Sequence, residues 1–132
     1  LFTKSNVVHL GDLYFGKTFP FVDHRAGGSV KGLIAALKRL VRELPPDVRV
    51  IPGHGEVSGL DGVRSYLAVI DETYNLVQNA VKKKQTVAQV QKANLLAKYT
   101  PFASDFVSVD DWLKTLYDEI SKPEPTVPKA KP

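Results

Sequence analysis

The sequence predicts a mixed α/β domain with a parallel pair of strands, and three patterns carry this prediction. Short apolar runs at residues 7–10 and 48–51 each lead into a glycine-containing loop, which is typical of buried strands. Between them, apolar residues recur at helical spacing from Leu33 to Leu44. A strand, a helix and a strand in this order form a βαβ unit, whose parallel strands end at the same edge of the sheet.

The helices expected around this unit have recognisable ends. Ser29 is a preferred residue for capping the first helix, and Pro45-Pro46 stops it. Thr86 and Ser108 each begin a pattern that resembles a capping box, so two shorter helices should start there. A long helix is expected from Asp61, and its apolar side consists of Val63, Leu67, Ile70, Tyr74, Val77 and Val81.

The length of 132 residues suits one domain. We assign residues 1–121 to this domain and residues 122–132, which are rich in Pro and Lys, to a flexible tail. The chain contains no Met and begins at Leu1, and its first residues read as the continuation of a structural element that starts earlier. A fragment or a processed product is therefore expected, and an exported protein that has lost its signal peptide is the alternative.

Composition excludes several classes of function. Without Cys the chain forms neither disulfides nor thiolate metal sites. No apolar run is long enough to cross a bilayer, so we expect a soluble protein, either cytoplasmic or exported. The net charge of +4 comes largely from the run at residues 82–84 and from Lys129 and Lys131. Cations at 82–84 suit the end of a helix, and this pattern does not favour nucleic-acid binding.

Two residues are candidate metal ligands. Asp12 follows the first strand, and His54 follows the second between Gly53 and Gly55. Because parallel strands end at one edge, the two side chains should share a rim, where open α/β sheets place their ligands. The alternatives are that Asp12 is an ordinary turn residue and that a backbone carbonyl satisfies His54. His9 lies within the strand and is expected to be packed or to support a ligand.

Other polar and aromatic residues near this rim are candidates for contact with a substrate. Tyr14, Phe15, His24 and Arg25 are candidates for the substrate edge, although aromatic residues after a strand are commonly core residues and His24 also suits a solvated loop. Asp23 is expected to tie down its own loop. The turn before Ser29 matches no phosphate-binding fingerprint, and no nucleophile elbow of a serine hydrolase is present.

The ordered motifs VVHLGD, FPFVD, AGGS and VIPGHG resemble the carboxyl-terminal half of the metallo-β-lactamase fold hydrolases, over residues 6–56 and more loosely over the helices that follow. The resemblance implies the βαβ half of a four-layered αββα sandwich, followed by carboxyl-terminal helices. It also implies two zinc ions at one edge of the sheets. Asp12 in HLGD would bridge them, and His54 in PGHG would bind one of them.

The resemblance further implies a hydrolase that directs a metal-held hydroxide at an ester, thioester, lactone or β-lactam carbonyl of a small-molecule substrate. The HxHxDH motif of the family and its next His, which supply most of the ligands, are missing. The chain alone is therefore expected to be inactive, and its partner would be the missing amino-terminal half or a dimer mate covering the open sheet. Iron or manganese would suit the same two ligands. The alternative is a non-catalytic interaction module that has lost its metals.

Overall fold

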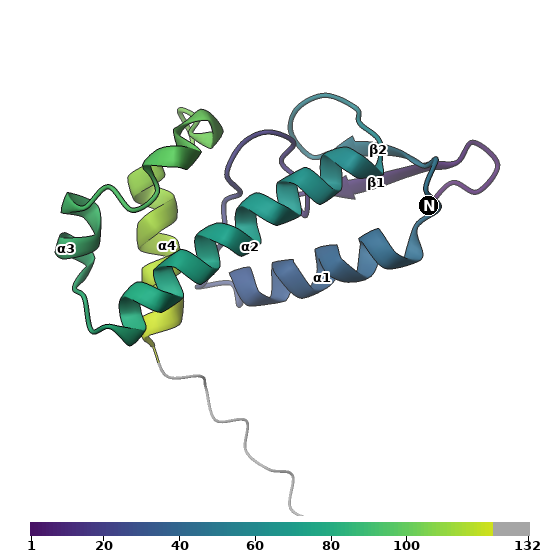
Figure 1. The fold of residues 1–132 in the computed structure, drawn as a ribbon. Helices are drawn as coiled ribbons and strands as arrows, with labels where there is room; N and C mark the ends of the chain where they lie inside the picture. The colour runs from purple at the N-terminus through teal and green to yellow at the C-terminus, as the bar shows by residue number, and fades with distance from the viewer. Residues whose placement is uncertain (123–132) are drawn as a thin grey trace, which may run out of the picture.

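A computed structural model of the chain describes residues 1–122 and shows a mixed α/β arrangement (Figure 1). A two-stranded sheet, formed by β1 (Val7–Gly11) and β2 (Arg49–Pro52), lies at one end, and the shorter helices lie at the other. Apart from Lys122, the tail expected from the sequence falls outside the described residues. Within residues 1–122, no helix combines the length and the apolar character needed to span a bilayer.

The predicted order of strand, helix and strand is confirmed, and the two strands are parallel. Val8 pairs with Val50 and His9 with Ile51, before the register shifts between His9 and Gly11. Val8, Leu10 and Val50 are buried, whereas His9 is exposed. The alternation of apolar and polar positions therefore gives the sheet one face toward the helices. The expectation that this unit is half of a two-sheet sandwich stays a prediction.

Helix α1 (Val30–Glu43) connects the strands, and its limits follow from local chemistry. The hydroxyl of Ser29 accepts a hydrogen bond from the Gly32 N–H at 2.9 Å, as the N-cap assignment predicted. At the other end the N–H of Leu44 bonds the Leu40 carbonyl before Pro45 stops the helix. The buried face consists of Val30, Leu33, Ile34 and Leu37.

Helix α2 (Leu60–Lys82) is the long helix expected from the sequence, and it packs against both α1 and α4. In Figure 1 it runs from the sheet to the group of shorter helices, so it links the two ends of the molecule. Its buried Thr73 hydroxyl donates to the Val69 carbonyl at 2.8 Å and accepts from the Trp112 indole N–H at 3.0 Å. The Trp112 ring stacks on Phe19 with centroids 5.5 Å apart. The core thus extends from the first loop to α4.

Two short helices begin at the predicted caps. Both α3 (Val87–Lys92) and α4 (Val109–Ser121) have complete capping boxes, formed by Thr86 with Gln89 and by Ser108 with Asp111. Between them lies a 3-10 helix, η1 (Ala97–Phe102), which the sequence patterns did not predict. Its Pro101 and its lack of a side-chain cap explain why no helix signal is visible there.

Candidate functional site

The structure brings Asp12 and His54 together at the carboxyl ends of the parallel strands. Asp12 directly follows β1 and His54 lies two residues beyond β2. The distance from Asp12 Oδ1 to His54 Nε2 is 3.4 Å. Both side chains face solvent, with exposed fractions of 77% for Asp12 and 58% for His54. An exposed pair of this kind contributes little to stability.

The loops that carry these residues are held together by backbone contacts at Gly53. The Gly53 N–H donates to the Gly11 carbonyl at 2.8 Å and to the Tyr14 carbonyl at 3.0 Å. A Cβ at position 53 would lie 2.6 Å from both Asp12 Oδ1 and the Gly11 carbonyl oxygen. Only glycine allows this close approach, which gives a physical reason for the glycine before His54.

Aromatic stacking sets the orientation of the His54 ring. Phe15 is buried, and its ring stacks on the imidazole with centroids 4.6 Å apart and planes inclined by 18°. On the other side of His54, Gly55 has a φ of +100°, which side-chain-bearing residues rarely adopt. Phe15 thus holds the imidazole ring from one side, and the backbone turns sharply at Gly55, directly after His54.

The separation of the pair fits two adjacent positions on one metal ion. Zinc binds His nitrogen and carboxylate oxygen at about 2.0–2.2 Å, so two such ligands in tetrahedral geometry are about 3.4 Å apart. The observed 3.4 Å matches this value and is longer than a usual N–H···O hydrogen bond. Within residues 1–122, however, no three His, Asp or Glu side chains gather into a group that could hold a metal ion. The spacing of the pair is thus compatible with ligation of one ion, but two side chains do not make a metal site.

His9 supports the turn that precedes Asp12. Its Nδ1 accepts a hydrogen bond from the Gly11 N–H at 2.9 Å, at the point where the register of the sheet shifts. The side chain is exposed, so of the two expectations for His9 the packed one is wrong, and the one that it supports a ligand stays a prediction. Its contact is with the backbone adjoining Asp12, and the Nδ1 atom acts as an acceptor there.

The residues predicted for the substrate edge fall into two groups. Tyr14 and Phe15 are buried beneath the rim, where Phe15 contacts His54 directly. His24 and Arg25 lie farther along the same loop, where the Asp23 carboxylate accepts the N–H groups of Arg25 and Ala26 at 3.0 and 3.3 Å. Asp23 therefore ties down its loop, as its position in the sequence predicted.

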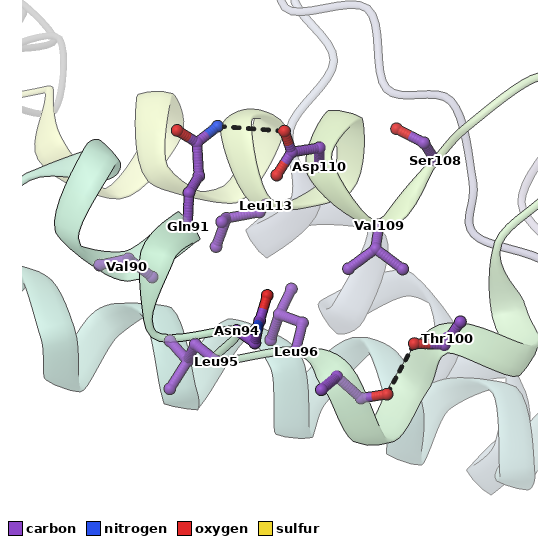
Figure 2. Close-up of a pocket in the computed structure, with 11 residues that line it drawn as sticks. Val90, Gln91, Asn94, Leu95, Leu96, Thr100, Ser108, Val109, Asp110 and Leu113 are labelled. Atoms are coloured by element: carbon purple, nitrogen blue, oxygen red, sulfur yellow. Dashed lines mark hydrogen bonds between the residues drawn. The ribbon is translucent and has the colours of Figure 1, made fainter.

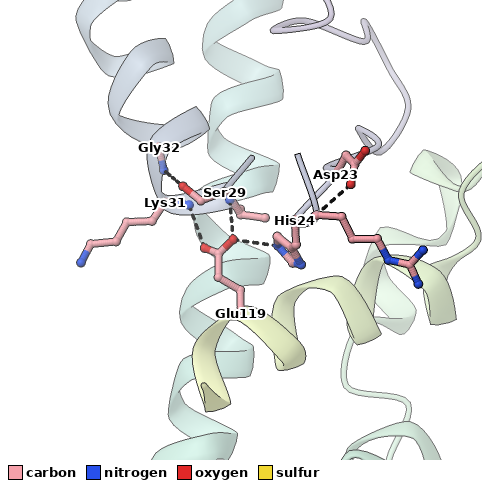
Figure 3. Close-up of polar contacts among 8 residues, drawn as sticks. Asp23, His24, Ser29, Lys31, Gly32 and Glu119 are labelled. Atoms are coloured by element: carbon pink, nitrogen blue, oxygen red, sulfur yellow. Dashed lines mark hydrogen bonds and ion pairs between the residues drawn. The ribbon is translucent and has the colours of Figure 1, made fainter. Parts of the chain in front are cut away.

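His24 belongs to a second polar cluster, at the start of α1 (Figure 3). Glu119 reaches this point from α4 and accepts hydrogen bonds from His24 Nε2 at 3.0 Å, from the Val30 N–H at 2.6 Å and from the Lys31 N–H at 3.0 Å. With Ser29 bonding the next N–H, the first three N–H groups of α1 are all satisfied. An open pocket of about 780 Å³ adjoins the cluster, and its lining includes Tyr74 and Gln78 of α2.

A smaller hollow lies between α4 and the segment formed by α3 and η1 (Figure 2). It encloses about 320 Å³, and its floor is apolar, with Val90, Leu96 and Leu113 among the lining residues. At its rim, Gln91 Nε2 lies 3.4 Å from Asp110 Oδ2. These groups suit the packing of α3 on α4, and the Ser108 and Thr100 hydroxyls that also line the hollow bond the backbone of their own turns.

The chain matches no protein-family model and no curated protein. Among the features above, the pair of Asp12 and His54 is the arrangement with the clearest chemical potential. The two residues combine exposure, a fixed spacing and loops shaped by glycine.

Proposed function

We propose that this chain is the carboxyl-terminal part of a zinc-dependent hydrolase similar to the metallo-β-lactamase fold enzymes, with Asp12 and His54 as metal ligands. The observation that supports the proposal best is the 3.4 Å separation of Asp12 Oδ1 and His54 Nε2, because two ligands of one zinc ion have this spacing. Their place at the carboxyl ends of parallel strands agrees with the usual position of ligand sites in open α/β sheets.

In the proposed enzyme each residue has a distinct task. A bound zinc ion would supply a Lewis acid that polarises a carbonyl and makes water nucleophilic near neutral pH. Asp12, which has two carboxylate oxygens, would bridge two such ions, and His54 would bind one of them through Nε2. Phe15 would keep the imidazole in the orientation that ligation requires. The substrate would be a small molecule with an ester, thioester, lactone or β-lactam carbonyl.

Two ligands do not complete a catalytic zinc site, which needs about three protein ligands and an open position. We propose that the others come from an amino-terminal half of the same protein or from a second subunit. The chain alone should then bind zinc weakly and show no turnover. The assignment of His24 and Arg25 to the substrate edge stays a prediction, whereas Tyr14 and Phe15 are buried beneath the rim and would support it from below.

One observation favours a second candidate function. Among the described residues no third ligand accompanies Asp12 and His54. A non-catalytic interaction module with the same half-fold would show this arrangement if it had lost its metals. The two candidates differ in what full-length protein does, since only the hydrolase requires zinc.

Zinc content and hydrolysis measured on two polypeptides test the proposal. The 132-residue chain and the full-length product of its gene are assayed on thioester and lactone substrates, each as wild type, Asp12→Ala, His54→Ala and Asp105→Ala. Asp105 is exposed in a loop before α4 and serves as the control. We expect zinc-dependent turnover in the full-length protein and in Asp105→Ala, and its loss in the other two variants. Full activity of the short chain, or unchanged activity of both ligand variants, would contradict the proposal.

A further inference from the structure

We infer that Tyr14 is a positioning residue, whose buried hydroxyl links the loop of Asp12 to the loop of His54 and so fixes the spacing of the two side chains. Its importance for zinc binding rests on the function proposed above. Its effect on the geometry of the two loops does not depend on that function, and the two claims can be tested separately.

Residue 14 contacts the loop after β2 at two points. Its carbonyl accepts the N–H of Gly53, the neighbour of His54, at 3.0 Å. Its hydroxyl lies 3.0 Å from the Ser58 hydroxyl, farther along the same loop. The side chain is only 3% exposed, so the hydroxyl is directed toward Ser58 rather than toward a substrate in solvent. These bonds connect the segments that follow the two strands on both sides of His54.

The first two turns of α2 pack against the hydrogen bond between Tyr14 and Ser58. A Cβ at Gly62 would lie 2.7 Å from the Tyr14 hydroxyl and 2.6 Å from the Ser58 hydroxyl. Glycine at this third position of α2 leaves the room that the hydrogen bond between the two hydroxyl groups needs. One turn later, the Tyr66 ring meets the Tyr14 ring edge-on, with centroids 5.1 Å apart and an interplanar angle of 69°.

Tyr66 closes the space below the loop of Asp12. Its side chain is 1% exposed, and its hydroxyl has no partner of normal hydrogen-bond geometry among residues 1–122. Burial raises the pKa of this phenol well above its ordinary value, and the backbone at Phe15 offsets part of the rise. Tyr14 therefore packs between the buried face of α2 and the two loops. Its neighbour in sequence, Phe15, transmits the position to the His54 ring by stacking.

A purely structural role would also explain a buried tyrosine, and the two roles predict different results. If Tyr14 only fills the core, removal of its hydroxyl lowers stability and leaves the His54 ring where it is. If Tyr14 positions the ligands, the ring moves relative to Phe15. Because ring protons near an aromatic face resonate at unusual fields, the His54 ring resonances report this movement directly in the protein without metal.

The test compares Tyr14→Phe with Tyr117→Phe by NMR of the 132-residue chain and by zinc competition titration of the full-length protein. Tyr117→Phe is the matched control, since its hydroxyl donates to the Gln85 carbonyl at 2.8 Å on another part of the molecule. We expect Tyr14→Phe to shift the His54 ring resonances and to weaken zinc binding by about 10-fold or more, as loss of a supporting contact to a metal ligand does. The control should change neither.

Ser58→Ala removes the other end of the link and serves as the second variant, with the same two results expected. Unchanged His54 resonances in Tyr14→Phe and Ser58→Ala would overturn the inference, as would unchanged zinc affinity in protein that binds zinc. If the wild-type full-length protein binds no zinc at all, the proposed function fails. The His54 resonances then decide alone whether Tyr14 positions the two loops.

Discussion

The carboxylate of Glu119 accepts a hydrogen bond from the backbone N–H of Val30, at 2.6 Å, although the two residues are 89 positions apart in the chain. A second oxygen of the same carboxylate accepts the Lys31 N–H. Helix α4 therefore supplies the charged cap of α1, whose first residues end the loop that begins at Asp12. These hydrogen bonds connect α4 to the strand–helix–strand unit.

Replacing Glu119 should destabilise the protein measurably. Glu119→Ala leaves two helix N–H groups and the His24 ring without their acceptor, which should cost about 1–3 kcal/mol of unfolding free energy. Asp118→Ala is the control, since Asp118 is the exposed neighbour on the same helix, and it should change stability by less than about 0.5 kcal/mol. Urea denaturation followed by circular dichroism measures both, and equal effects would refute the capping role.

Gly62→Ala should lower stability although it lies in a helix. Helix propensity alone predicts a gain of up to about 1 kcal/mol for this change, the value that applies to a helix interior. The added Cβ would meet two hydroxyl groups at 2.6 and 2.7 Å, however, and must displace them. Asn79→Ala, at an exposed position of the same helix, should show the propensity gain without the clash. Thermal denaturation of both variants checks the prediction, and a rise in melting temperature for Gly62→Ala would count against the close packing at Tyr14.

Loss of the buried hydrogen bond between Trp112 and Thr73 should lower the free energy of unfolding by more than the net energy of one hydrogen bond. Thr73→Val keeps the shape of the side chain but leaves the buried indole N–H without its acceptor, at a cost of about 1–3 kcal/mol. Thr100→Val is the control, because the Thr100 hydroxyl bonds a carbonyl of its own turn at an exposed site. Trp112 is the only tryptophan, so its fluorescence follows unfolding in urea. A loss no larger than that of the control would show that the indole finds another partner.

The buried phenol of Tyr66 predicts a loss of stability at high pH. Its pKa is raised in the folded protein because burial disfavours the phenolate. The unfolded chain therefore releases this proton first, and unfolding becomes easier by up to about 1.4 kcal/mol per pH unit above about pH 10. Tyr66→Phe should remove this part of the pH dependence, whereas Tyr117→Phe should keep it. Urea titrations between about pH 9 and pH 11 compare the slopes, and identical slopes for wild type and Tyr66→Phe would contradict the assignment.

Local signals in the sequence were sufficient for much of the fold. Ser29, Thr86 and Ser108 cap the helices that their patterns predicted, because capping depends on residues only three positions apart. The approach of Asp12 to His54 also followed from the sequence, since parallel strands joined by a helix must end at one edge.

Contacts between distant residues were not predictable in this way. Neither the cap that Glu119 gives to α1 nor the bond from Tyr14 to Ser58 has a local signature, because each depends on how α4 or α2 packs against the rest of the molecule. Helix η1 was missed for a different reason, since a 3-10 helix containing a proline has neither the length nor the periodicity of an α-helix. The sequence patterns thus located the rim of the candidate site but not the residues that support it.

Anomalous diffraction at the zinc edge, from crystals of the full-length protein grown with zinc, would show whether Asp12 and His54 bind one ion. We expect a zinc peak about 2.0–2.2 Å from both Asp12 Oδ1 and His54 Nε2, with further ligands from outside residues 1–122. A zinc peak bound elsewhere, with Asp12 and His54 still 3.4 Å apart and unligated, would contradict this expectation.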